Sequence, residues 1–427
     1  MLSKFAAPAL ITRIATLISG SAGANLIVLL ATPVLSRLYS PDSFGMLALF
    51  VSISAVMGTV MCLRYEQAVY LPEQHETAHK LALGATSIAL VLTLLFTLAC
   101  ITWMHLELSS LLGSYTILLP LVGLGLALYN LMSNWAVRME KVSDVAKTRL
   151  YRASAQVTSQ LFFAMIGMLQ IGLIIGDLIG RFAGITNIFR KFSRLENSAN
   201  NSQPRLKNTY NALREYWRFP LISTPTALLN VAVMQSPSIL LATLYSPTAA
   251  GFYFMAQRII AAPMALMGQS VAQGYTAELA SRFNQNTYDA ASLFFRSAGW
   301  LLIIGAPMLL IIGLLAPELM PKLLGGDWHT AGEYILILTP FFIGQFVMSP
   351  LSTTLNVIHK QHWLFLWDLV RLACVIPSFV VAVYAGWSAE MSLLLFSCLM
   401  AGSYAVLFIL ISLTLKLVHK DENFRSP

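Results

Sequence analysis

The chain consists mostly of long apolar runs separated by short polar segments. A helix needs about 20 mostly apolar residues to cross the hydrocarbon layer of a membrane, and helices satisfy their own backbone hydrogen bonds there. Runs of this length, bounded by charges, proline or glycine, predict an all-α integral membrane protein with twelve transmembrane helices. The predicted spans are Ile14–Leu35, Phe44–Leu63, Leu81–Met104, Tyr115–Ala136, Ala153–Leu169, Gly172–Phe189, Phe219–Leu241, Ala249–Tyr275, Leu293–Leu315, Tyr334–Ile358, Trp363–Ala385 and Met391–Leu415.

The longest polar stretch lies near the middle of the chain and is rich in asparagine, serine and basic residues. It predicts a linker between two sets of spans. We expect an N-terminal six-helix half over residues 1–190, a cytoplasmic linker over 191–218 and a C-terminal six-helix half over 219–427. Because each half has an even number of spans, the halves would be parallel repeats around a central cavity.

A short motif supports this division. Leu38-Tyr39-Ser40-Pro41, with Gly45, recurs as Leu244-Tyr245-Ser246-Pro247, with Gly251, and both copies connect the first two spans of a half. Ser-Pro is also common where any helix begins, so simple turn punctuation remains an alternative. The matching position of the two copies favours a true repeat.

The basic residues fit a membrane topology better than a nucleic-acid partner. The chain carries 27 Lys and Arg against 19 Asp and Glu, a formal net charge of +8. These residues fall between apolar runs and form no basic patch interleaved with aromatic residues, so we expect no nucleic acid. Lys and Arg in short loops mark the cytoplasmic side. If both termini are cytoplasmic, only Arg37 and Lys322 among the loop residues lie outside.

Two pairs of opposite charges stand inside predicted spans. Ionisable residues cost about 2.5–3.5 kcal/mol there on insertion scales, and they usually face a cavity or a partner. Asp177 and Arg181 are four residues apart, and Asp368 and Arg371 are three apart. Each pair therefore lies on one helix face and can neutralise itself. A structural ion pair and a functional site remain open as alternatives for both pairs.

Arg258 differs from these pairs, because it lies near the middle of its span and no acidic residue lies within two turns of it. It must find an anion in another helix or in a substrate. Arg64 and Glu66 stand in Leu63-Arg64-Tyr65-Glu66 at the cytoplasmic end of the second span. Charges cost less at that depth, so a solvated helix end is the simpler alternative for them.

Small residues form a stripe in the sixth predicted span. Glycine recurs there every fourth residue and allows another helix to approach closely. The stripe therefore predicts a close helix–helix contact beside Asp177 and Arg181. The four glycines are Gly172, Gly176, Gly180 and Gly184.

Signatures of enzymes are missing from the sequence. It contains no phosphate-binding P-loop, no GxSxG nucleophile motif and no cluster with metal-ligand spacing. We therefore expect no enzyme activity, no cofactor and no metal site. Without an ATP-binding motif on this chain, transport would depend on an ion gradient or on the substrate gradient.

Several short motifs together resemble the Wzx-type oligosaccharide flippases, the polysaccharide-biosynthesis branch of the multidrug/oligosaccharidyl-lipid/polysaccharide (MOP) exporter superfamily. Singly they are weak, but they occur in the family's order over nearly the whole chain. They are Thr32-Pro33, Ser36-Arg37-Leu38-Tyr39-Ser40-Pro41, Phe44-Gly45, Leu63-Arg64-Tyr65-Glu66, Leu71-Pro72, Tyr216 to Pro220, Leu228-Leu229-Asn230, Pro317-Glu318-Leu319, Gly326-Asp327-Trp328, Ala331-Gly332-Glu333-Tyr334 and Ser349-Pro350-Leu351-Ser352.

The resemblance implies a flippase of the bacterial inner membrane. Its substrate would be an oligosaccharide repeat unit on undecaprenyl diphosphate, moved from the cytoplasmic to the periplasmic leaflet for O-antigen of lipopolysaccharide or a related polymer. It implies alternating access of the two halves and coupling to protons or sodium. A polysaccharide polymerase and chain-length machinery would be partners.

Physical chemistry suggests which residues would serve such a substrate. A diphosphate is strongly anionic, and arginine recognises phosphate oxygens through two parallel hydrogen bonds. A carboxyl group whose pKa is raised by burial can exchange a proton. The candidates for a cationic substrate cavity are Arg258, Arg371, Arg181 and Arg64. The candidates for ion coupling are Glu66, Asp177 and Asp368.

Three other functions remain as alternatives. A drug/cation antiporter of the same superfamily also has twelve spans, but unpaired arginines in its cavity would repel cationic substrates. A membrane O-antigen polymerase or ligase resembles proteins with a large periplasmic loop, whereas the longest external loop expected here covers only Ala316 to Glu333. A peptidoglycan-precursor flippase moves a similar lipid but generally has more spans.

Overall fold

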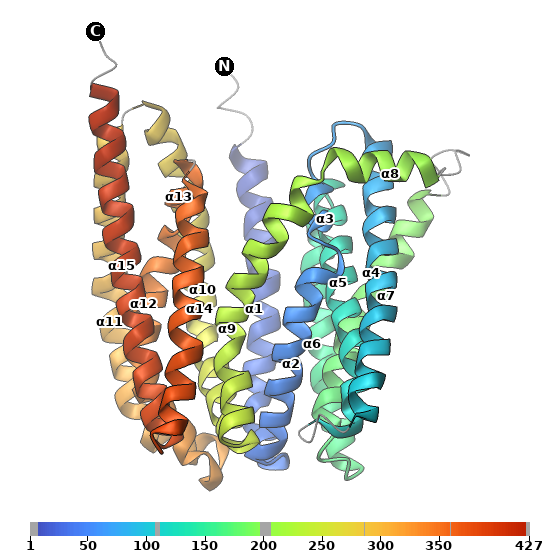
Figure 1. Cartoon of the computed structure of the whole chain (residues 1–427), viewed down its shortest axis with the longest axis vertical. Helices are drawn as coiled ribbons and strands as arrows, with labels where there is room; N and C mark the ends of the chain where they lie inside the picture. Colours follow the sequence, from blue (N-terminus) through green and yellow to red (C-terminus); the bar gives the residue numbers. More distant parts are fainter. Residues whose placement is uncertain (1–6, 107–111, 197–205, 286, 359, 424–427) are drawn as a thin grey trace. The chain divides into compact units, whose positions relative to one another are not determined.

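The structure is a computed structural model that describes residues 7–423 except 107–111, 197–205, 286 and 359 (Figure 1). The described residues form helices and contain no β-strand. In chain order the helices are α1 (Ala7–Leu38), α2 (Pro41–Met61), α3 (Tyr65–Ala68), α4 (His75–His105), η1 (Gly113–Leu118), α5 (Leu119–Arg138), α6 (Val142–Met165), α7 (Gly172–Glu196), α8 (Leu206–Glu215), η2 (Phe219–Ser223), α9 (Thr224–Leu244), α10 (Pro247–Gln285), α11 (Thr287–Leu324), η3 (Gly326–Trp328), α12 (His329–Leu351), α13 (Thr354–Val357), α14 (Gln361–Tyr384) and α15 (Ala389–Asn423).

All twelve predicted spans lie on these helices, so the protein is an all-α membrane protein as predicted. Among the described residues, nine helical segments are long and apolar enough to cross a membrane. They include α2, α4, α12, α14 and most of α15. The other three predicted spans lie on α6, α7 and α10.

Contacts divide the chain into two compact units, residues 1–243 and residues 244–427. Helix α9 therefore groups with the first unit, except for its last residue. The predicted linker ends earlier, at residue 218, and α8 lies within it. The two six-span halves, with α9 as the first span of the second half, remain a prediction.

In the first unit, α6 packs along α1 and α7, while α5 packs along α2, α4 and α7. Figure 1 shows α8 lying across the end of α4, which it contacts. A buried cluster at this end includes Met61, Tyr65, Leu81, Leu131 and Trp135. These side chains join the end of α2 to α3, α4 and α5, so they fix the segment that carries Arg64 and Glu66.

In the second unit, α12 is the central helix and packs against α10, α11 and α15. Aromatic rings fill the space between these helices. The ring of Phe341 in α12 lies 6.2 Å from that of Tyr404 and 5.5 Å from that of Phe396, both in α15. Phe396 in turn lies 5.8 Å from Phe379 of α14. Such pairs add stability beyond simple burial and hold α14 and α15 in place around the site described below.

The outer surfaces of both units are apolar over long stretches. On α4, Leu94 and Leu98 are exposed, and on α11, Trp300, Ile303 and Leu314 are exposed. Water would strongly disfavour apolar surfaces of this extent, whereas lipid tails are compatible with them. The exposure pattern therefore agrees with a bilayer around the helices.

The two copies of the repeated motif adopt the same local structure. Ser40 caps α2 and accepts a hydrogen bond from the backbone N–H of Ser43 at 3.3 Å. Ser246 likewise accepts one from the N–H of Ala249 at 3.1 Å, before α10. In each copy proline is the first helical residue, where its missing N–H costs nothing. The copies thus share both position and capping geometry.

Candidate functional site

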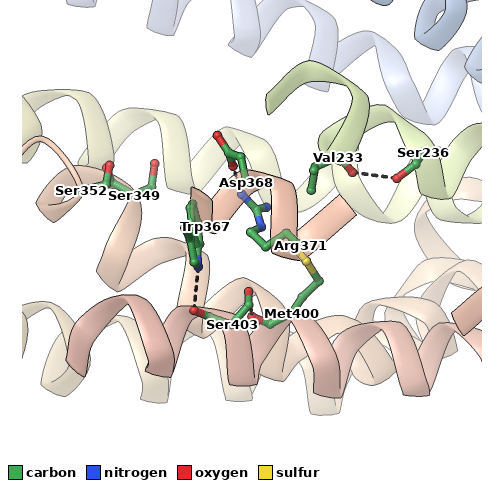
Figure 2. A network of polar contacts seen from close by, with 9 residues as sticks. All are labelled: Val233, Ser236, Ser349, Ser352, Trp367, Asp368, Arg371, Met400 and Ser403. Carbon is green, nitrogen blue, oxygen red and sulfur yellow. Dashed lines mark hydrogen bonds and ion pairs between the residues drawn. The ribbon is translucent and has the colours of Figure 1, made fainter. Parts of the chain in front are cut away.

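The second unit contains a buried ion pair on α14. Nη1 of Arg371 lies 2.9 Å from Oδ1 of Asp368, and the side chains are only 1% and 6% exposed. The predicted pairing on one helix face is therefore confirmed. Figure 2 shows Arg371 between Asp368 and the α15 residues Met400 and Ser403.

Aromatic rings enclose the same guanidinium group. Its central carbon lies 4.1 Å from the centroid of Trp367 and 5.4 Å from that of Tyr404. Trp367 is held by a hydrogen bond from its Nε1 to the backbone oxygen of Ser403, at 2.9 Å. Cation–π contacts stabilise a charge that is shielded from water. Packing therefore holds the guanidinium group of Arg371 in a defined position.

The ion pair leaves part of Arg371 unsatisfied. Its Nε and Nη2 atoms are buried and have no hydrogen-bond partner among the described residues. A buried donor without a partner costs about 1–3 kcal/mol, and more for a charged group. Arg371 also lines a cavity of about 180 Å³ between α14 and α15, together with Trp367, Met400 and Ser403. A guanidinium group with spare donors beside a cavity is suited to an anionic ligand.

Arg258 lies on α10 with a partly buried side chain. It precedes Ala261 by three residues, so the two residues share a helix face. Ala261, Met264 and Gly268 line a cavity of about 320 Å³ between α10 and α12, and Gln345 of α12 lines its other side. The cavity therefore begins one turn from Arg258, which is not itself among its lining residues.

The first unit contains a second buried pair, on α7. Nε of Arg181 lies 2.6 Å from Oδ2 of Asp177, and both side chains are 6% exposed. Gln156 of α6 donates a hydrogen bond from Nε2 to the other carboxylate oxygen, at 3.3 Å. Arg152, one turn before Gln156, is close enough to interact electrostatically with both members of the pair. The cluster thus contains two guanidinium groups and one carboxylate, of which only Arg181 forms a direct ion pair, so its positive charges outnumber its negative charge.

The glycine stripe of α7 packs against α6, as predicted. A methyl group at Gly180 would lie 2.7 Å from Cβ of Gln156 and 3.0 Å from the backbone oxygen of Arg152. Gly176 faces Gln160 in the same way. Because these glycines have no side chains, α6 can approach α7 closely. This approach brings Gln156 within reach of Asp177.

The third pair lies where α2 leads into α3. Leu63 and Arg64 have positive φ angles of 46° and 60°, which are uncommon for residues other than glycine. Nη1 of Arg64 lies 3.6 Å from Oε1 of Glu66, whose side chain is 7% exposed. Oε2 of Glu66 is buried and has no hydrogen-bond partner among the described residues. A solvated helix end, the simpler alternative, does not describe Glu66.

Neighbouring side chains fix this segment. Asn134 of α5 donates a hydrogen bond to the backbone oxygen of Glu66 at 2.9 Å. Arg138 donates from Nη1 to the backbone oxygens of Val69 and Tyr70, at 3.1 and 3.2 Å. Burial raises the pKa of the Glu66 carboxyl above its ordinary value, although Arg64 acts in the opposite direction. The carboxyl is therefore poised to bind a proton at a higher pH than a solvated glutamate.

Glu66→Gln is expected to raise the thermal midpoint of the purified protein more at about pH 8 than at about pH 5. Folding raises the pKa of the Glu66 carboxyl, so proton binding by this carboxyl stabilises the folded state at low pH. This stabilisation is lost as the pH rises through the pKa that the carboxyl has in the folded state. Glutamine removes the cost of the buried charge at high pH. Glu215→Gln, at an exposed position of α8, serves as the control. A larger gain at the lower pH would contradict the expectation.

Several residues around these pairs were not among the predicted site residues: Arg152, Gln156, Gln160, Trp367 and Tyr404. One signal for the first three was available, because they recur every four residues on α6 just as the glycines do on α7. Trp367 and Tyr404 had no such signal, since an aromatic residue in an apolar helix is indistinguishable from core. The structure brings together the members of each predicted pair, and it places Arg258 on a different helix from all of them.

Comparisons with known proteins agree with this architecture. The family described as "Polysaccharide biosynthesis protein" matches residues 34–333. The chain is similar to the structure "Lipid II flippase MurJ, inward closed conformation", with 14% identity over 98% of this chain and 93% of that chain and a TM-score of 0.66. No curated protein matches the sequence.

A second similar structure is a transporter of another kind. It is titled "Inward-facing conformation of a multidrug resistance MATE family transporter of the MOP superfamily". Identity to it is 11% over 96% of both chains, with a TM-score of 0.59. At identities this low, the TM-scores show a shared helical membrane fold and nothing more, in agreement with the predicted fold class.

Proposed function

Because the chain belongs to the polysaccharide biosynthesis protein family, as its motifs predicted, we propose that it is a flippase for lipid-linked oligosaccharides. Its substrate is an oligosaccharide repeat unit on undecaprenyl diphosphate, which it carries from the cytoplasmic to the periplasmic leaflet for O-antigen or a related surface polysaccharide. The protein lies in the bacterial inner membrane with both termini in the cytoplasm, and it works by alternating access.

The observation that carries the proposal, besides the family, is Arg371. Its guanidinium group is 1% exposed, and two of its nitrogens have no hydrogen-bond partner among the described residues. Asp368 offsets the charge of this group, but a diphosphate would satisfy its two free donors, which a cationic drug could not. The cluster of Arg152, Asp177 and Arg181 carries more positive than negative charge, and it therefore also supports an anionic substrate. These features favour the flippase over a drug/cation antiporter of the same fold.

Ion coupling belongs to the same proposal. Of the three candidate carboxylates, Asp177 and Asp368 are each within 3 Å of an arginine nitrogen, so both are engaged in close ion pairs. Glu66 has a longer contact of 3.6 Å and one oxygen without a hydrogen-bond partner in the described part of the chain. We therefore rank Glu66 first as a proton carrier and assign the other two to positioning the arginines.

Deleting the gene is expected to abolish surface polysaccharide while lipid-linked repeat units accumulate inside the cell. The wild-type gene should restore export, and Arg258→Ala should lower it about ten- to a hundredfold, since a hydrogen bond to a charged group contributes about 1.5–3 kcal/mol. Surface polymer and lipid-linked intermediates would be measured by gel electrophoresis and mass spectrometry of extracted lipids.

Arg296→Ala is the matched control, because Arg296 is an exposed arginine on α11. It should restore export fully at the same membrane level. Full export with Arg258→Ala would remove that residue from the site. Unchanged surface polymer in the deletion strain, combined with increased uptake of a cationic dye, would instead identify an antiporter.

A further inference from the structure

Helix α8 and the turn after it present aromatic and basic side chains to the surroundings. Tyr210 and Trp217 are 64% and 49% exposed, and Arg214 and Arg218 are also exposed. Tyr210 and Arg214 lie four residues apart, so they share one face of α8. We call these four residues the α8 surface.

The opposite face of α8 is fixed to the first unit. Ala212 is 5% exposed and belongs to the buried cluster with α4 and α5. Leu213 packs against Gly84 of α4, and its backbone oxygen accepts a hydrogen bond from the hydroxyl of Tyr65 at 3.0 Å. Because one face is anchored in this way, the α8 surface has a defined orientation away from the core.

The position of the α8 surface along the chain places it at a membrane boundary. An apolar segment able to cross a membrane begins at Phe219, directly after Arg218. Leu221 and Ile222, the next exposed residues, are 66% and 59% exposed and are suited to lipid tails. In Figure 1, α8 runs across the end of α4, whereas α4 is itself a candidate span. The α8 surface therefore lies where lipid headgroups meet water.

The side-chain chemistry of the surface fits one kind of occupant. Tryptophan and tyrosine are enriched at membrane interfaces, where an apolar ring and a polar tip are both satisfied. Arginine recognises phosphate oxygens with its planar fork of donors. Glu215 offsets one of the two positive charges but leaves an excess of one. An excess positive charge favours anionic headgroups over zwitterionic ones.

We propose that the α8 surface binds the headgroups of anionic phospholipids and so anchors the segment before α9 at the bilayer surface. Arg214 and Arg218 hold phosphate groups, while Tyr210 and Trp217 lie at the level of the glycerol backbone. This site is independent of the substrate proposed above, because it depends on no residue of the candidate cavities.

The test measures lipid binding by the full-length protein rather than transport. Protein purified from nanodiscs of phosphatidylcholine with phosphatidylglycerol would be analysed by native mass spectrometry for retained lipid, and its thermal midpoint would be measured with and without phosphatidylglycerol. The double variant Arg214→Gln/Arg218→Gln should retain about fivefold less phosphatidylglycerol for each arginine removed. Its thermal midpoint should no longer respond to phosphatidylglycerol.

Two further variants separate this site from a general charge effect. Arg282→Gln/Arg296→Gln removes the same charge from α10 and α11 and should behave like the wild type. Arg214→Lys/Arg218→Lys keeps the charge and should recover most of the retention. Wild-type retention by the double glutamine variant, equal retention of phosphatidylcholine, or an equal thermal response to inorganic phosphate alone would each overturn the proposal.

Discussion

Gly180→Val is expected to separate α6 from α7 and to destabilise the first unit by about 1–3 kcal/mol or more, the range for overpacking a close contact. Even the first carbon of a side chain at this position would lie 3.0 Å from the backbone oxygen of Arg152 and 2.7 Å from Cβ of Gln156. Backbone cannot rotate away as a flexible side chain can, so the helices must move apart. Thermal unfolding of the detergent-purified protein, followed by size-exclusion chromatography, would measure the loss.

The matched control for this prediction is Gly402→Val. Gly402 also lies inside a long helix, α15, and a methyl group there would meet no atom within 4 Å. Both changes replace glycine by a β-branched residue in a helix, so the difference between them isolates the packing. Equal thermal midpoints for the two variants would show that the glycine stripe is not a packing device.

The positions of the helices followed from the sequence because a membrane span must be long and apolar. Tyr115 at the predicted start of the fourth span lies in η1, and Phe219 at the predicted start of the seventh is the first residue of η2. Where polar residues continue a helix, the helix extends beyond the predicted span. Helix α6 begins at Val142 rather than Ala153, because residues outside the hydrocarbon layer can remain helical without being apolar.

The ion pairs could be predicted because they are local. Residues three or four positions apart on a helix must be neighbours, and both in-span pairs formed as expected. What the arginines meet on other helices could not be predicted. Trp367 and Tyr404, which enclose Arg371, are separated in sequence by most of α14, a turn and nearly half of α15. Their approach depends on how α14 packs against α15.

The segment around Glu66 shows a different limit. Arg64 and Glu66 were placed at the cytoplasmic end of the second predicted span, which runs to Leu63, with a solvated helix end as the alternative to a site. Burial of Glu66 depends on two consecutive residues with positive φ, Leu63 and Arg64, and on the side chains of Asn134 and Arg138 from α5. Nothing in the local composition indicates that a non-glycine turn of this kind will form.

The cluster around Asp177 has an uneven distribution of charge, because two arginines lie near one carboxylate. Loss of the carboxylate and loss of one arginine should therefore have different effects. Arg181 and Arg152 both interact with Asp177, and the ring of Tyr129 lies 5.1 Å below the guanidinium of Arg152. Without the carboxylate, two buried or half-buried guanidinium groups would face each other. Without Arg181, the carboxylate would still have Arg152 and the amide of Gln156.

Asp177→Asn is therefore expected to destabilise the protein by about 3–5 kcal/mol, the range for an uncompensated buried charge, whereas Arg181→Gln should cost much less. Thermal midpoints of the purified variants would measure the difference, and adding Arg152→Gln to Asp177→Asn should recover part of the loss by removing the repulsion. Glu278→Gln and Arg282→Gln provide the control, since that pair has the same four-residue spacing and a contact of 2.7 Å but is 39–52% exposed; each change there should cost less than about 1 kcal/mol. Equal losses for Asp177→Asn and Arg181→Gln would mean that Arg152 does not share the carboxylate, and the excess positive charge assigned to this cluster would then be wrong.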